Sequence, residues 1–198
     1  MAQPAFAWQH TGWAWLAEDM PIGYWIDPVC EESIPEDYCQ TMLDEVYATW
    51  EAVPCVDYEF SYEGAYEGIG GVKRTFDLND PTNHQVFNDP DNLAEVGVLG
   101  VTLVNSFGVA FNLDGEIYTH GDNGDIAYND NVDFATHEAA ESGNCNGETN
   151  IRSVALHEVG HFMGLGHSCE EDEPCADADL RGAVMYWSSG SCETLVDP

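Results

Sequence analysis

The sequence predicts an α/β fold in which strands and helices alternate along the chain and form two halves. Three observations predict it: short strand-like segments before residue 130, an amphipathic helical pattern near residue 40, and a second helical pattern near residue 150. Such alternation is typical of a sheet that is covered by helices. The 198 residues, 44% hydrophobic and 12% aromatic, predict one folded domain over residues 1–198.

The first expected elements are a strand and a helix. Residues 22–26, Ile-Gly-Tyr-Trp-Ile, predict a strand that the Asp27–Pro28 step ends. Ser33 and Glu36, with Pro35 between them, then form a capping-box pattern, which predicts a helix start. Apolar residues recur at four-residue spacing along one face of this helix, which predicts packing on a sheet: Tyr38, Met42, Val46 and Trp50.

The middle of the chain predicts further strands joined by loops. Residues 56–61 alternate between apolar and polar types, as in a half-buried strand, and the glycines within 64–71 end it. The Asp-, Asn- and Pro-rich stretch 72–95 predicts a long surface loop. Residues 96–104 are nearly all apolar and predict a buried or edge strand, and another strand is expected at 125–129.

The chain is strongly acidic. Four Lys and Arg residues stand against 37 Asp and Glu residues, so the formal net charge is -33. Phosphate backbones and anionic membranes are repelled by such a surface, and no nucleic acid or lipid partner is expected. No segment approaches the roughly 18 to 20 apolar residues of a membrane span. Six Trp, nine Tyr and eight Phe favour a packed core over a disordered chain. The acid predicts a solvated surface, suited either to salty surroundings or to basic substrates and cations.

The cysteines predict an oxidising compartment, and hence a secreted protein. Seven of them occur, at positions 30, 39, 55, 145, 169, 175 and 192, which is many for a reduced cytosolic protein. The simplest interpretation of seven cysteines is three disulfides and one free thiol. Local pairing of Cys30 with Cys39 and of Cys169 with Cys175 fits the spacing, and the connectivity as a whole stays open. Residues 1–6 lack the basic start and apolar run of a signal peptide, which predicts a mature form.

The strongest motif is a set of histidines with the spacing of metal ligands. Residues 157–167 read His-Glu-Val-Gly-His-Phe-Met-Gly-Leu-Gly-His. On a helix, His157 and His161 lie on one face and can bind the same ion. Gly164 can end the helix in a left-handed conformation, so that His167 returns as the third ligand. Three neutral imidazoles leave a fourth position open, which predicts a catalytic zinc.

Glu158 lies beside the ligand pair and is not needed as a ligand. Its predicted role is to take a proton from the attacking water and to pass it to the leaving amine. The alternative is a chance H-E-x-x-H on an ordinary buried helix. The two further positions, Gly164 and His167, each have a geometric reason and favour the zinc interpretation.

With these residues the sequence resembles the metzincins, zinc peptidases with the signature H-E-x-x-H-x-x-G-x-x-H and a later methionine-bearing turn. Met185, in Ala-Val-Met-Tyr, is similar to that turn. The resemblance implies that its side chain lies beneath the histidines without binding the ion. Among metzincins the sequence most resembles the matrixins of the bacterial type. Ser168 follows the last histidine as a serine does in matrixins, and segment 124–134 resembles the strand and acidic segment that precede their zinc helix. The implied fold is a twisted mixed sheet with a backing helix and an active-site helix. These elements form an upper part up to about residue 164, and a smaller lower part from about residue 165 carries the third histidine and the methionine turn.

The resemblance implies a zinc-dependent endopeptidase that acts on proteins as a monomer. In matrixins an edge strand pairs with the extended substrate, and the matching residues here are Val98, Leu99, Gly100, Val101 and Thr102. Trp187 stands where some metzincins have a tyrosine ligand, and Ala127 stands where vertebrate matrixins have a histidine for a second zinc. One zinc is therefore expected. The chain ends at Pro198, near the point where matrixins continue into a final helix, which is expected to be lacking or cut away.

Three alternatives remain open. Calcium could be held by an acidic segment, although a solvated loop is the alternative there: Asp122, Asp125, Asp130 and Asp133. A catalytically silent metzincin-fold module could bind or inhibit basic proteins through the acidic surface, but such a module has no use for Glu158. A calcium-binding structural protein would account for the acid and leave the histidine motif unexplained.

Overall fold

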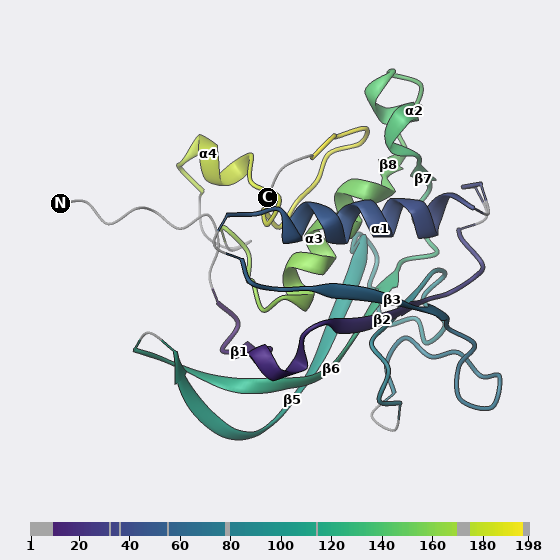
Figure 1. Ribbon diagram of the computed structural model, residues 1–198. Coiled ribbons are helices and arrows are strands. Elements are labelled where there is room, and N and C mark those ends of the chain that lie inside the picture. The colour runs from purple at the N-terminus through teal and green to yellow at the C-terminus, as the bar shows by residue number, and fades with distance from the viewer. Residues whose placement is uncertain are drawn as a thin grey trace.

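The computed structural model describes residues 10–31, 33–35, 37–54, 56–77, 80–113, 115–169 and 175–195. It confirms the predicted mixed α/β fold (Figure 1). The elements follow in the order β1 (Trp13–Ala14), the 3₁₀ helix η1 (Ala17–Asp19), β2 (Ile22–Ile26), α1 (Tyr38–Glu51), β3 (Phe60–Ala65), β4 (His84–Val86), β5 (Gly100–Leu113), β6 (Glu116–Tyr128), β7 (Phe134–Ala135), α2 (His137–Glu141), β8 (Thr149–Asn150), α3 (Ile151–Phe162) and α4 (Ala178–Arg181).

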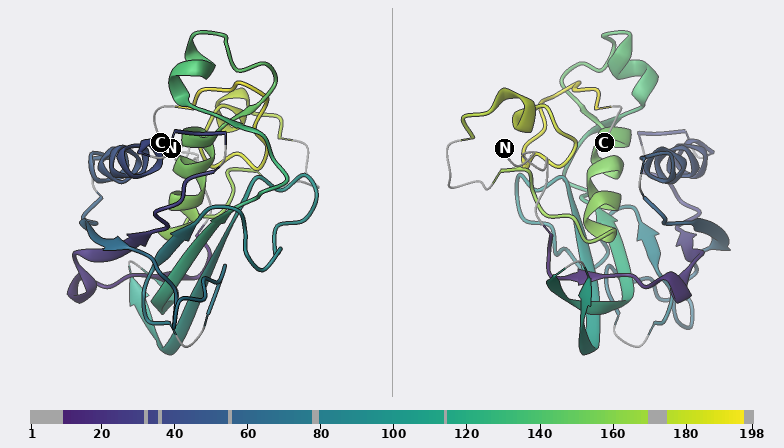
Figure 2. Two further views of the ribbon diagram at one scale, coloured as in Figure 1. Left: turned by 90° about the vertical axis from the view of Figure 1, so that its right-hand side faces the viewer. Right: turned by 60° about the vertical axis from the view of Figure 1, so that its left-hand side comes forward.

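The main sheet is mostly parallel and has one antiparallel edge. Its strands follow the order β1-β6-β4-β2-β3, and β5 pairs antiparallel with β6. Both α1 and α3 lie on the same side of this sheet (Figures 1 and 2). The main core lies between these two helices and the sheet, and joins residues such as Tyr24, Val46, Tyr128 and Leu156. The short strands β7 and β8 form a separate parallel pair.

The first strand and helix agree with the sequence prediction. The strand β2 has the predicted bounds, and its alternate residues Ile22, Tyr24 and Ile26 are buried. The predicted apolar stripe of α1 faces the core. The predicted capping box was wrong: the helix begins at Tyr38 after Asp37, and the Ser33 hydroxyl instead lies within hydrogen-bond distance of the Glu31 carboxylate and of the Phe134 backbone oxygen. The chain makes a turn before the helix, where the Tyr38 N–H donates to the Pro35 oxygen.

Four predictions for the middle of the chain, three of strands and one of a loop, need correction. The strand predicted at 56–61 begins only at Phe60, although Val56 and Tyr58 still pack against the core. The predicted loop 72–95 contains β4, a buried strand inside the sheet. Its Gln85 is polar yet satisfied, since its amide donates to the Tyr47 hydroxyl at 2.7 Å and its carbonyl accepts from Tyr128 at 2.7 Å. Of the strand predicted at 96–104, residues 100–104 begin the longer β5, whereas residues 96–99 precede it and are not strand. The strand predicted at 125–129 is the end of the longer β6, which stops at Tyr128.

The disulfides include both local pairs that the spacing allowed. Cys30 is bonded to Cys39 and Cys169 to Cys175, and a third bond joins Cys145 to Cys192. The remaining Cys55, the predicted capping residue Glu36, residues 1–6 and Pro198 lie outside the described residues. Among the helices that are described, none is long and apolar enough to cross a membrane.

Candidate metal centre

The helix α3 carries the histidine motif and is fixed at its start and along its length. Asn150 caps the helix, since its side-chain oxygen accepts the Arg152 N–H at 3.1 Å. Trp50 of α1 donates its indole N–H to the backbone oxygen of Leu156 at 3.0 Å. The helix is therefore held against α1 by a buried hydrogen bond as well as by apolar packing.

The turn after α3 is built around Gly164. Its φ of 97° confirms the predicted helix stop at a residue without a side chain. A Cβ at this position would also lie 2.8 Å from the backbone oxygen of Trp13. Thr11 donates its N–H and its hydroxyl to the Gly164 oxygen at 3.0 and 2.9 Å, and Trp15 donates its indole N–H to Phe162 at 2.8 Å. The N-terminal segment therefore clamps the turn that leads to His167.

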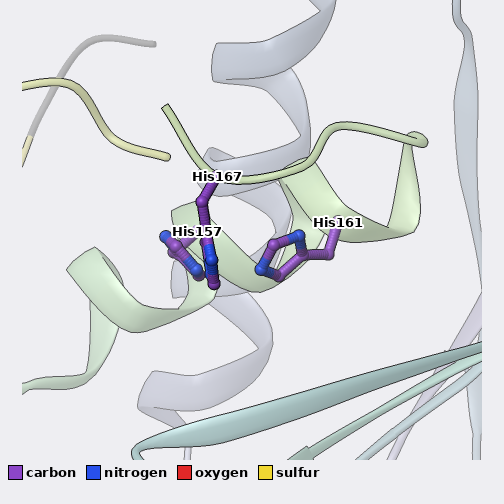
Figure 3. A group of neighbouring side chains, drawn as sticks. All are labelled: His157, His161 and His167. Atoms are coloured by element: carbon purple, nitrogen blue, oxygen red, sulfur yellow. The ribbon is translucent and has the colours of Figure 1, made fainter. Parts of the chain in front are cut away.

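The structure brings the three predicted ligands together (Figure 3). His157, His161 and His167 each offer a ring nitrogen within 4.8 Å of the others. Their ring centroids are separated by 4.5, 4.9 and 5.2 Å. Imidazoles at these separations can all face one ion, which is the arrangement that a three-histidine zinc site requires.

The backbone orients two of the rings for metal binding. The Nδ1 atom of His157 lies 2.8 Å from the Val184 oxygen, and that of His161 lies 2.7 Å from the Leu165 oxygen. Because a carbonyl only accepts, both Nδ1 atoms carry the proton, and each Nε2 keeps its lone pair for a metal. Burial, followed by the charge of His161, lowers the pKa of His157 to about 3. His157 is therefore neutral at ordinary pH, and the donor set fits zinc.

The turn around Met185 is hydrogen-bonded to the segment that follows His167 and to His157. Met185 is buried, and its backbone oxygen accepts the Ser168 N–H at 2.8 Å. The Ser168 hydroxyl donates to the Leu180 oxygen at 2.8 Å. These bonds join the segment of His167 to the methionine turn. The same turn provides the Val184 oxygen that orients His157.

Glu158 lies at the floor of the site, with only 5% of its surface exposed. Thr102 donates its hydroxyl to Glu158 Oε2 at 2.6 Å. Burial raises the pKa of Glu158, while nearby His161 and the Thr102 hydrogen bond act in the opposite direction. A carboxylate that is shielded from water, held by a hydroxyl and close to His161 can accept a proton within the cleft.

A cleft of about 780 Å³ opens over these residues. One wall is formed by residues 95–102, which include all five residues that were predicted to bind substrate, and the other by residues 186–189. The β5 strand pairs only with β6 in the described part of the chain, so its outer edge is open toward the cleft. An unpaired edge can hydrogen-bond an extended peptide.

The C-terminal segment around Glu193 and Leu195 also lines the cleft and is hydrogen-bonded to α3. Ser153 of α3 donates its hydroxyl to the Glu193 oxygen at 3.0 Å and accepts the Leu195 N–H at 2.9 Å. Both Ser153 and Leu195 line the cleft. The Cys145–Cys192 disulfide ties the same segment to the loop after α2.

The four carboxylates suggested for calcium do not form one cluster. Asp125 is buried, whereas the others are exposed: Asp122, Asp130 and Asp133. Among the described residues, the only group of three or more His, Cys, Asp or Glu residues close enough to share an ion is the histidine set. Asp125 instead has its Oδ1 3.0 Å from Nδ1 of His84. Burial raises the pKa of Asp125 to about 8 and lowers the pKa of His84. Calcium binding stays a prediction.

Sequence reasoning missed the contact between Thr102 and Glu158. Thr102 was predicted as part of the substrate strand, and nothing local connects it with a residue 56 positions later. The carbonyl groups of Val184 and Leu165 were also missed, because backbone atoms leave no sign in the residue types. The signal that could have revealed Thr102 is a hydroxyl residue within a strand that is otherwise apolar.

Residues 14–175 match the matrixin family. The matched range contains β5, α3, the three histidines and Glu158, whereas Met185 lies beyond it. A search of curated proteins found no match to the chain.

Proposed function

The chain belongs to the matrixin family of zinc-dependent metallopeptidases, and we propose from this that it is an endopeptidase that hydrolyses internal bonds of protein substrates. One observation carries the proposal. Three histidines converge in a cleft, two of them with Nδ1 bound to backbone oxygens, and Glu158 lies buried beside them. A site with only a structural role has no use for a base at an open position.

In this proposal His157, His161 and His167 hold one zinc ion. When bound, zinc polarises the carbonyl of the scissile bond and makes a water molecule more acidic. Glu158 takes a proton from the attacking water while the water oxygen bonds to the carbonyl carbon. The same carboxyl then gives the proton to the amide nitrogen as the C–N bond breaks, so the products are an acid and an amine. Met185 acts as an apolar floor and takes no part in proton transfer.

The substrate lies along the open edge of β5. We infer that residues 98–102 pair with an extended peptide through backbone hydrogen bonds, because all five line the cleft, where Gly100, Val101 and Thr102 form the free edge of β5 and Val98 and Leu99 directly precede it. Pairing of this kind depends on the backbone and accepts many sequences. Side chains of the substrate would then contact the opposite wall at residues 186–189 and Leu195. Selection among substrates would arise mainly on that wall.

Three further properties belong to the proposal. Secretion is supported by three disulfides, which persist in oxidising compartments. Residues 1–198 act as one monomeric catalytic domain. Calcium bound by the acidic segment 122–133 would be an addition that the zinc chemistry does not need.

The test combines metal content with cleavage of unfolded casein. We expect one zinc per chain, loss of cleavage with a chelator and recovery with added zinc. Glu158→Gln should keep the zinc and lose at least about 100-fold in kcat, a typical contribution of a general base. Glu138→Gln, at an exposed position in α2, makes the same change away from the site and should act like wild type. Full zinc occupancy without cleavage of varied substrates would contradict the proposal and favour a silent binding module.

A further inference from the structure

The side chain of Glu158 is held from the strand opposite its helix. The Thr102 hydroxyl lies 2.6 Å from Glu158 Oε2 and 3.0 Å from the backbone oxygen of the same residue. An ionised carboxylate and a carbonyl both only accept, so the hydroxyl must be the donor. A donor has one hydrogen to give, and the shorter distance favours the carboxylate.

The neighbouring strand position leaves room for this contact. Residues 100 and 102 share one face of β5, since side chains alternate along a strand. At Gly100 a Cβ atom would lie 3.0 Å from Cγ and 3.1 Å from Cδ and Oε1 of Glu158. The Glu158 side chain therefore occupies the space that a glycine leaves open, and Thr102 fixes the end of it.

We propose that Thr102 is a positioning residue, which fixes Glu158 Oε2 and leaves Oε1 to take the proton from the attacking water. This inference rests on the proposed peptidase function. Threonine suits the role because its β-branched side chain has few rotamers, so the hydroxyl direction is set by the strand. A glutamate without this bond would sample more rotamers, and a base that is out of reach of its proton is ineffective.

The arrangement also connects substrate binding with the base. Thr102 belongs both to the strand that is proposed to bind the peptide and to the hydrogen bond that holds Glu158. The register of β5 is fixed by its pairing with β6, where Thr102 lies opposite Ile126. One rigid strand therefore sets the distance between the bound peptide and the base.

The test compares two substitutions at position 102. Thr102→Val keeps the shape and removes the hydroxyl, and we expect kcat to fall by about 10- to 100-fold, the usual effect of losing a hydrogen bond to a charged group. KM should stay within about twofold, because the bond does not contact the substrate. Thr102→Ser keeps the hydroxyl and should recover most of kcat. Thr119→Val is a matched control, since the Thr119 hydroxyl on β6 contacts the Gly12 oxygen instead.

A double substitution separates positioning from general stability. In the Glu158→Gln background, Thr102→Val should leave the residual rate unchanged, because it acts through Glu158. Wild-type kcat in Thr102→Val with zinc bound, or an equal loss in Thr102→Ser, would overturn the inference while the peptidase proposal stands. If Thr102→Val loses zinc or unfolds, Thr102→Ala and Thr102→Ser decide by the same criterion. A wild type that binds zinc and cleaves nothing would overturn both proposals.

Discussion

Gly160 of α3 packs so closely against Met185 that a Cβ atom at position 160 would lie 2.2 Å from the methionine sulfur. The same atom would lie 3.0 Å from Cζ2 of Trp50. The helix, the methionine turn and α1 meet here without space for one methyl group. Gly160 lies next to His161, so this packing fixes the turn of α3 that carries His161 against the methionine turn.

Gly160→Ala should therefore weaken both the fold and the metal site. Forcing a methyl group into a packed interior costs about 1 to 3 kcal/mol, and alanine recovers up to about 1 kcal/mol of helix propensity. Moving Met185 also moves the Val184 oxygen that orients His157. We expect a lower melting temperature and faster loss of zinc to a chelator. Gly182→Ala is the control, because its Cβ would meet only ordinary contacts at 3.6 and 3.7 Å.

Removing the Cys145–Cys192 disulfide should loosen the C-terminal wall of the cleft. Replacing both cysteines by alanine should lower the free energy of unfolding by about 2 to 4 kcal/mol. It should also raise KM for peptides several-fold, since Ser189 and Leu195, on either side of Cys192, line the cleft. Replacing Cys30 and Cys39 by alanine should lower stability and leave KM unchanged, because that bond joins the start of α1 to the preceding loop. Equal KM changes in both variants would contradict this assignment.

Asp125→Asn should stabilise the protein in neutral and alkaline solution. His84 Nε2 lies 2.9 Å from the Arg74 oxygen and must donate to it, so Nδ1 of a neutral His84 accepts. The donor opposite Nδ1 is a protonated Asp125, in agreement with burial raising the pKa of this carboxyl from 3.8 to about 8. Stability from the protonated form is complete below about pH 4 and is lost as the pH rises through about 8.

The variant should therefore exceed wild type by an amount that grows between about pH 4 and pH 8, on the order of a few kcal/mol at the upper end. Asparagine has nearly the same shape and can donate to His84 at any pH. Chemical denaturation at several pH values measures the difference. Asp122→Asn, at an exposed position, should show no such trend. A constant difference between Asp125→Asn and wild type would mean that Asp125 is ionised in the folded protein.

Ionic strength should affect cationic and anionic substrates in opposite directions. The formal net charge is -33, and each of the four basic residues already lies against a carboxylate or a carbonyl: Lys73, Arg74, Arg152 and Arg181. For a lysine-rich peptide, kcat/KM should fall by about tenfold or more when salt rises from about 20 mM to about 500 mM. A glutamate-rich peptide of equal length should gain. A flat response for both would mean that surface charge does not steer substrates.

The sequence was informative wherever a signal was local. The strand β2, the helix α1 and the histidine motif each depend on residues that are neighbours along the chain. The histidine site was predictable because two ligands share a helix face and the third follows a glycine turn. The Gly164 φ of 97° confirms the predicted turn at this glycine.

Features that depend on distant partners were not predictable. The sequence did not predict the strand β4, because Gln85 is polar. Gln85 can be buried because its side chain hydrogen-bonds to the hydroxyls of Tyr47 and Tyr128, which are distant in the sequence. The outer half of the β5–β6 pair has no apolar run, since it is held by backbone pairing away from the core. The C-terminal segment that lines the cleft is held by the hydrogen bond from the Leu195 N–H to the Ser153 hydroxyl, and no residue pattern predicts that bond.

The clamp between Thr11 and Gly164 joins residues that are 153 positions apart. During synthesis Thr11 leaves the ribosome 153 residues before its partner Gly164 does. The oxygen that orients His157 belongs to Val184, which emerges later still. Contacts between residues so far apart along the chain form slowly, because a long loop must close first. A nascent chain therefore has no assembled histidine site, and the proposed proteolytic activity would begin only when translation of the domain is nearly complete.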